Sequence, residues 1–178
     1  MKGGLETKRS TLAVAQVDAA GVFEGYASLF GAVDLGGDMV MPGAFTHTLR
    51  QQGAAAVKML WQHDAGTPLG VWLSITEDAR GLKVRGKLNL GVARAREVLA
   101  LMREGAVDGL SIGFRTRRAA KDSRAGVRRL LALDLVEISI VTFPMLPQAR
   151  VETVKHNARS RWRDAADAMQ AKLDNACR

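Results

Sequence analysis

Regular alternation of apolar and polar residues is the sequence feature that most restricts the fold. In residues 57–62, 71–75, 82–88 and 110–115, apolar side chains occupy every second position or nearly so. A period of two places those side chains on one face of a half-buried β-strand. We therefore expect each strand to turn one apolar set toward the core: Val57, Met59, Trp61; Val71, Leu73, Ile75; Leu82, Val84, Leu88; and Leu110, Ile112, Phe114.

Two further strands and two helices complete the predicted elements. Residues 22–29 are rich in strand formers, and residues 130–143 form a long apolar strand that Pro144 and Pro147 end. Residues 44–52 follow Pro42 and predict a helix closed by Gly53, and residues 93–105 have helical spacing. The charged residues 115–129 predict a solvated, mobile loop, and residues 71–75 and 82–88 predict an antiparallel hairpin.

This order of elements predicts the fold class α+β, rich in β-structure. We expect a compact, mostly antiparallel β-barrel with surrounding helices, because the strands are not each followed by a helix as in a doubly wound sheet. Residues 1–150 are assigned to this domain, after an extended start over the first 18 residues. Residues 151–178 read as a basic, amphipathic C-terminal tail with helical spacing.

Composition excludes several classes of protein. The net charge of +8 favours an acidic partner, but aromatic residues are only 5% and no nucleic-acid-binding motif is present, so nucleic acid is not expected as a specific partner. The single cysteine, Cys177, allows no internal disulfide, and three distant histidines suggest neither a metal site nor a cofactor. Neither a signal peptide nor a stretch of about 20 apolar residues is present, which predicts a cytoplasmic protein without membrane contact.

Ser111 lies in the pattern G-x-S-x-G, residues 109–113. The same pattern marks the nucleophile of α/β-hydrolases, where a strand must turn sharply into a helix at the serine. Here the strand alternation continues through Ser111, and only His156 follows it, so the α/β-hydrolase interpretation is rejected. Gly109 and Gly113 would leave room for a substrate backbone beside Ser111. An ordinary serine on a solvent-facing strand remains the alternative.

His63 is the histidine best placed for chemistry, because it stands where a strand passes into the turn formed by residues 63–66. Asp64 is a poor partner for its ring, since neighbours along an extended chain point apart. His47 is expected on the surface of the first helix, and His156 in the polar tail. A surface histidine with a local hydrogen bond is the alternative for His63.

Glu137 interrupts the apolar strand at residues 135–141. A carboxylate among apolar neighbours is costly unless another group meets it. That group could be an arginine of a neighbouring strand, or the ring of a histidine as in a catalytic triad. Ser139 shares the face of Glu137 and is a weaker candidate for either role.

Taken together and in order, six segments of the chain resemble the prohead maturation proteases of tailed bacteriophages, which share a fold with the herpesvirus assembly proteases. The resemblance covers roughly residues 21–149. It rests on GYASLFGAVDLGGDMVMPGAF, VKMLWQHD, PLGVW, GLKVRGKL, DGLSIGF and LVEISIVTFPMLPQA.

The resemblance implies a serine endopeptidase with Ser111 as nucleophile and His63 as base. It implies Glu137 as the third member, where herpesvirus relatives use a second histidine. The implied substrates are scaffolding protein, or a scaffolding segment of the major capsid protein, and the enzyme itself, inside the procapsid in the host cytoplasm. The herpesvirus analogy suggests a homodimer. The alternative is a non-catalytic capsid-assembly factor that binds scaffold or nucleic acid through its positive charge.

Overall fold

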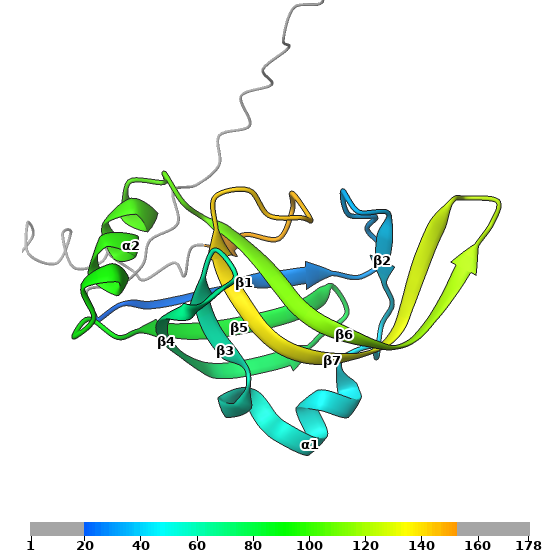
Figure 1. Cartoon of the computed structure of the whole chain (residues 1–178), viewed down its shortest axis with the longest axis horizontal. Coiled ribbons are helices and arrows are strands. Elements are labelled where there is room, and N and C mark those ends of the chain that lie inside the picture. The colour runs from blue at the N-terminus through cyan, green and yellow to red at the C-terminus, as the bar shows by residue number, and fades with distance from the viewer. Residues whose placement is uncertain (1–19, 153–178) are drawn as a thin grey trace, which may run out of the picture.

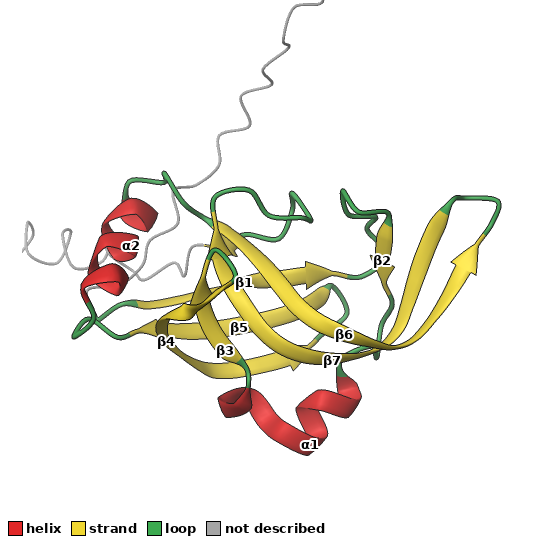
Figure 2. Cartoon of the chain, viewed as in Figure 1, coloured by secondary structure: helices red, strands yellow, loops and turns green. Residues whose placement is uncertain are grey.

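The computed structural model describes residues 20–152, which form one curled sheet with two helices outside it (Figure 1). Strand and helix colours in Figure 2 separate the two classes of element. In chain order the elements are β1 Val22–Leu29, β2 Asp38–Val40, α1 Thr46–Ala56, β3 Lys58–Trp61, β4 Asp64–Glu77, β5 Gly81–Leu88, α2 Ala93–Arg103, β6 Gly109–Asp122, β7 Val127–Val141 and β8 Val151–Glu152.

The strands follow the order β2-β7-β3-β4-β5-β1-β8, and β6 pairs with the other edge of β7. Only the β2–β7 and β3–β7 pairs are parallel. Residues 149–151 close the sheet, because they bond to both of its ends. The N–H of Tyr26 in β1 donates to the carbonyl of Arg150, and the N–H of Leu110 in β6 donates to that of Ala149. The predicted β-rich, mostly antiparallel barrel is thereby confirmed.

The core fills the inside of this curled sheet with aliphatic and aromatic side chains. Phe23 and Trp72 pack edge to face, with ring centroids 5.7 Å apart. Gly86 of β5 makes this packing possible, because a Cβ there would lie 2.6 Å from Met59 and 2.7 Å from Phe23. Leu69, Leu82, Leu88, Leu110, Leu133, Ile138 and Ile140 are fully buried around them.

The predicted inward face of residues 71–75 is wrong in part. Val71 and Leu73 are exposed, whereas Trp72 and Ile75 are buried. The register of β4 against β5 shifts between Trp72 and Ser74. Such a bulge adds one residue to the strand and so reverses which side chains face the core, a change that alternation cannot reveal.

Residues 115–129 are not the loop that the sequence predicts. They continue β6 and β7 into a two-stranded hairpin that projects beyond the barrel, at the right of Figure 1. Residues 115–121 are all exposed. Because both faces meet water, neither selects apolar residues, and the period-two signal of a strand is lost.

The first helix also differs from the prediction. α1 runs from Thr46 to Ala56, and Gly53, with φ of 66°, kinks it rather than closing it. At the start of α1, the Phe45 N–H and the Thr46 hydroxyl donate hydrogen bonds to the carboxylate of Glu77 in β4. His47 is half-buried rather than a surface residue, and its Nε2 has no hydrogen-bond partner among the described residues.

Val151 and Glu152 form β8, which pairs with β1, and they therefore belong to the barrel. The described residues end at Glu152. The amphipathic helix predicted in the tail and the extended start predicted over residues 1–18 lie outside the described residues. Neither α1 nor α2 combines the length and the apolar composition that a bilayer crossing requires.

Candidate active site

Register in the sheet brings Ser111, Ser139 and Glu137 onto one face. Ser111 of β6 lies directly opposite Ser139 of β7, and Gly113 lies opposite Glu137. Directly opposed residues of an antiparallel pair point to the same side, and residues two apart on one strand share that side. The neighbouring Leu110, Ile138 and Ile140 point the other way, into the core. The strand therefore continues through Ser111, in agreement with the rejection of an α/β-hydrolase.

The carboxylate of Glu137 has two side-chain partners. Its Oε1 lies 2.7 Å from Nδ1 of His63, and its Oε2 accepts a 2.7 Å hydrogen bond from the Ser139 hydroxyl. The side chain of Glu137 is 10% exposed and that of His63 is 46% exposed. Of the two partners that the sequence left open for Glu137, the structure supplies the histidine.

The backbone that carries His63 is unusual. Gln62 and His63 form the two-residue turn between β3 and β4, where Trp61 pairs with Asp64. Both have positive φ, 51° and 62°. A two-residue hairpin turn of type I′ needs this conformation, which Asn-Gly adopts most easily. For larger residues it costs on the order of 1–3 kcal/mol each. The turn thus lies one residue earlier than predicted.

Hydrogen bonds to β7 and to the residue that follows it hold this strained turn in place. The Gln62 N–H donates to the Ile140 carbonyl, and the Gln62 side-chain amide donates to the Thr142 hydroxyl at 2.7 Å. The His63 N–H donates to the Ser139 hydroxyl at 3.1 Å. Ser139 therefore ties the backbone of His63 to the carboxylate of Glu137, and the histidine ring has little freedom to turn away.

Gly113 serves the site in a way that the sequence analysis did not anticipate. A Cβ at this position would lie 2.2 Å from Oε1 of Glu137. The missing side chain makes room for the carboxylate that holds His63, not for a substrate backbone. At Gly109 a Cβ would meet the Val141 carbonyl at 2.6 Å and Pro144 at 2.8 Å, so that position is also filled by the protein itself.

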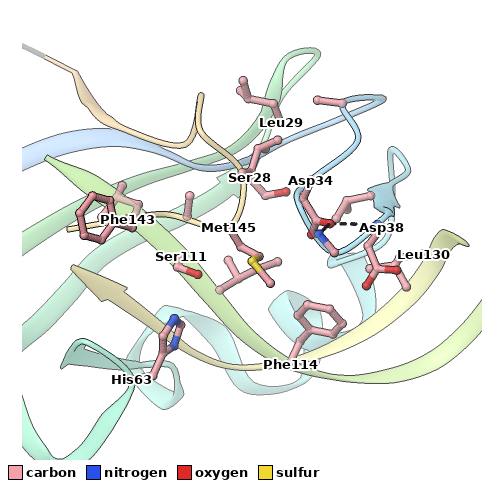
Figure 3. Close-up of a pocket in the computed structure, with 17 residues that line it drawn as sticks. Ser28, Leu29, Asp34, Asp38, His63, Ser111, Phe114, Leu130, Phe143 and Met145 are labelled. Carbon is pink, nitrogen blue, oxygen red and sulfur yellow. Dashed lines mark hydrogen bonds between the residues drawn. The ribbon is translucent and has the colours of Figure 1, made fainter. Parts of the chain in front are cut away.

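Ser111 and His63 both line one cavity of about 470 Å³ (Figure 3). Ser111 is only 7% exposed, whereas the rim residue Phe143 is 89% exposed. The β1–β2 loop forms one wall, and the segment after β7 forms another. The N–H of Leu35 donates to the carbonyl of Met145 and joins the two walls. Most of the lining is apolar: Ala27, Leu29, Ala32, Val40, Leu110, Ile112, Phe114, Leu130, Phe143, Met145 and Leu146.

Two further acidic side chains, Asp34 and Asp64, accept hydrogen bonds within their own chain segments. Asp34 accepts hydrogen bonds from the N–H groups of Gly36 and Asp38. Asp64 accepts from the Thr67 hydroxyl and the Gly66 N–H, and these bonds hold the pKa of its carboxyl below the usual range. Asp64 thus stabilises the start of β4, whereas the described partner of the His63 ring is Glu137.

The other histidines and possible ligands lie apart from this cavity. His47 is on α1, and His156 falls outside the described residues. Across residues 20–152, His, Cys, Asp and Glu side chains form no group of three that could hold a metal ion. The site thus offers the hydroxyl of Ser111, the imidazole of His63 and the carboxylate of Glu137, which is hydrogen-bonded to other side chains of the protein.

Comparison with solved structures finds the same fold in two viral proteases. The protease of KSHV, solved with a hexapeptide phosphonate inhibitor, superposes with a TM-score of 0.54 at 12% identity, over 73% of this chain and 63% of that chain. The capsid assembly protease of bacteriophage T4 gives a TM-score of 0.54 at 14% identity, over 67% of this chain and 80% of that chain. At these identities the likeness concerns the fold alone.

The sequence itself gives the family. The family model described as Caudovirus prohead serine protease matches residues 8–162, and the chain belongs to this family. The prohead protease of Enterobacteria phage HK97 is 39% identical over 142 aligned residues, in an alignment that covers 76% of this chain and 60% of that protein. The chain thus spans about 60% of the length of this relative. The resemblance that the sequence motifs carried is thereby confirmed.

Proposed function

We propose that this protein is a serine endopeptidase that acts in prohead maturation, with Ser111 as nucleophile, His63 as general base and Glu137 as the residue that orients the base. One observation carries the proposal: Nδ1 of His63 lies 2.7 Å from Glu137, while His63 and Ser111 line the same cavity. Membership of the prohead serine protease family supports the same assignment.

The geometry supports a separate role for each of the three groups. An ionised carboxylate only accepts hydrogen bonds, so Glu137 favours the tautomer of His63 that carries its proton on Nδ1. Nε2 then keeps a lone pair and can take the Ser111 proton as Oγ attacks a peptide carbonyl. As His63 becomes charged, the carboxylate stabilises the imidazolium. His63 returns the proton to the leaving amine, and water then releases the acyl group from Ser111.

The substrates that fit this assignment are capsid components. The HK97 relative is named a prohead protease and the T4 protein a capsid assembly protease. We propose that this chain cleaves scaffolding protein, or a scaffolding segment of the major capsid protein, and itself, within a procapsid assembled in the host cytoplasm. Hydrolysis of these segments is one-way and would commit the shell to maturation.

A fluorophosphonate probe tests the assignment directly, because it reacts covalently only with an activated serine. We expect labelling at Ser111, and its loss in His63→Ala. In cleavage assays with the co-expressed capsid protein, Ser111→Ala should lower turnover on the order of 10⁶-fold. Ser74→Ala, at an exposed position of β4 away from the cavity, is the matched control. Unchanged cleavage by Ser111→Ala would refute the proposal, and absence of labelling would favour a non-catalytic assembly factor.

A further inference from the structure

The hairpin that projects from the barrel carries a dense positive charge. We call residues 115–129 the arm; it consists of the outer part of β6, the turn, and the start of β7 (Figure 1). It contains one acidic residue, Asp122, and seven basic ones: Arg115, Arg117, Arg118, Lys121, Arg124, Arg128 and Arg129. All seven are exposed.

Three of these cations are already engaged within the protein. Arg117 pairs with Asp134 at 2.5 Å, Arg128 with Asp38 at 2.5 Å and Arg129 with Asp122 at 2.8 Å. The other four form no ion pair with any described residue: Arg115, Arg118, Lys121 and Arg124. The arm therefore has positive charge to offer to a partner.

The arm also presents an open strand edge. Among the described strands, β6 pairs only with β7 over residues 112–122, so its outer edge bonds to no other strand. A free edge offers alternating backbone N–H and carbonyl groups, which an extended peptide can pair with as an added strand. Lysine and arginine on an edge also discourage self-association between copies of the same chain, since like charges repel.

Register connects the arm to the wall of the cavity that holds Ser111. Lys121 lies opposite Arg128, which lies beside Asp38 of β2, and these directly paired residues share a face of the sheet. Asp38 lines the cavity, and the guanidinium of Arg128 donates two hydrogen bonds, of 2.5 and 2.7 Å, to the carboxylate of Asp38. β7 lies between β2 and the free edge of β6, and this free edge reaches the cavity itself at Ile112, which lines it.

We propose that the arm is a docking site for an extended, acidic polypeptide segment, which adds to the free edge of β6 and pairs its carboxylates with the four unengaged cations. The identity of this segment as part of the substrate, flanking the cleaved bond, rests on the proposed function. Docking itself needs no hydrolysis.

The arm suits a polypeptide better than a nucleic acid. Residues 115–129 contain no aromatic side chain on which a base could stack. The strand edge provides backbone donors and acceptors in alternation, which match a peptide backbone, whereas phosphates only accept. A peptide thus uses both the charge and the edge, and a nucleic acid would use the charge alone.

The test measures binding by the full chain with Ser111→Ala, so that cleavage plays no part. The probe is a fluorescein-labelled oligoglutamate on the order of ten residues long, enough to span the arm edge at about 3.3 Å per residue. The arm variant carries Lys121→Glu and Arg124→Glu. The matched control carries Arg50→Glu and Lys87→Glu, which make the same change in net charge on exposed positions of α1 and β5.

We expect the arm variant to bind the oligoglutamate about tenfold more weakly than the parent at low salt. The control variant should bind it like the parent. Added salt should lower the affinity of both variants for the peptide. An oligoglutamate with N-methylated backbone amides should bind more weakly, because it cannot pair with the edge. Equal binding by arm and control variants, or undiminished binding of the N-methylated peptide, would overturn the proposal. Tighter, arm-dependent binding of a short DNA duplex at equal salt would overturn it in favour of nucleic acid. Failure of the proposed hydrolase would appear separately, as absent fluorophosphonate labelling.

Discussion

The β6–β7 hairpin has two halves that share one hydrogen-bond ladder and differ in almost everything else. In the inner half, residues 109–114 pair with residues 135–141, and nearly every side chain is at least half-buried. Two of its polar side chains, Glu137 and Ser139, hydrogen-bond to each other, and Glu137 also bonds to His63 of the neighbouring turn. The outer half is the arm, which is rich in arginine and exposed except at Asp122 and Val127.

Backbone pairing alone therefore fixes neither the chemistry of a strand nor its sequence pattern. The inner half has the core on one face and the Gln62–His63 turn over the other, and the buried Glu137 and Ser139 there find protein partners. The arm has water on both faces, and its ion pairs are screened. We expect substitutions in the inner half to alter activity and stability strongly, and those in the arm to alter binding.

The largest effect expected in the inner half short of removing the candidate triad itself comes from Gly113→Ala. The new methyl group would displace Oε1 of Glu137, which cannot move without losing His63 or Ser139. Misplacement of the base by about 1 Å costs on the order of 10² in kcat. Steady-state cleavage of the capsid protein measures this, with thermal unfolding to show that the barrel remains folded.

Ala120→Gly in the arm is the matched control, since it makes the reverse change on an exposed strand residue and should leave kcat unchanged. If Gly113→Ala retained full activity, the carboxylate of Glu137 would not need the position that the structure gives it, and its role as the orienting residue would be wrong.

The next largest effect is expected as a difference in unfolding free energy between two truncations, one in each half of the hairpin. Ser139→Ala leaves the His63 N–H and one oxygen of buried Glu137 without their partner, which we expect to cost about 1–3 kcal/mol of unfolding free energy. Arg117→Ala removes an exposed ion pair with Asp134 and should cost less than about 1 kcal/mol. Urea denaturation of both variants measures the difference.

Ser139→Thr provides the conservative control, because its hydroxyl can restore both hydrogen bonds. A smaller loss for Ser139→Ala than for Arg117→Ala would contradict the contrast between the two halves. A loss of stability that Ser139→Thr failed to recover would indicate a packing effect instead of a hydrogen-bonding one.

The smallest expected effect is a pH dependence confined to the arm. Hydrogen bonds from the N–H groups of Ala125 and Arg124, together with Arg129, lower the pKa of Asp122 below its ordinary value. A lowered folded-state pKa means that the carboxylate stabilises the turn above the unfolded pKa of about 3.9 and loses this contribution as pH falls through the folded pKa. NMR titration of the Asp122 carboxyl, with amide exchange at Ala125, measures both.

Exchange of the Ala125 amide should rise at acid pH before that of amides in the inner half, and Asp122→Asn should remove the dependence. An Asp122 midpoint at or above the ordinary value would contradict the hydrogen bonding that the structure gives this turn.

Much of the inner half could be predicted from the sequence, and little of the arm could. Alternation through Ser111 placed it on a strand, and the cost of a carboxylate among apolar neighbours predicted a partner for Glu137. The arm escaped prediction because a strand exposed on both faces has no apolar period. The bulge at Leu73 escaped it too, because one extra residue shifts the register without leaving a mark in composition.

The sequence by itself indicated the strand-rich fold, because alternation is a local pattern, and its motifs indicated the family and, through that resemblance, the three residues proposed for chemistry. Only the tertiary structure decided that a strained Gln62–His63 turn lies over β7, that Ser139 and Gly113 hold and accommodate the Glu137 carboxylate, and that the arm stands beside the cavity. These depend on register between strands up to 90 residues apart, and no local pattern encodes which residues of distant strands lie opposite one another.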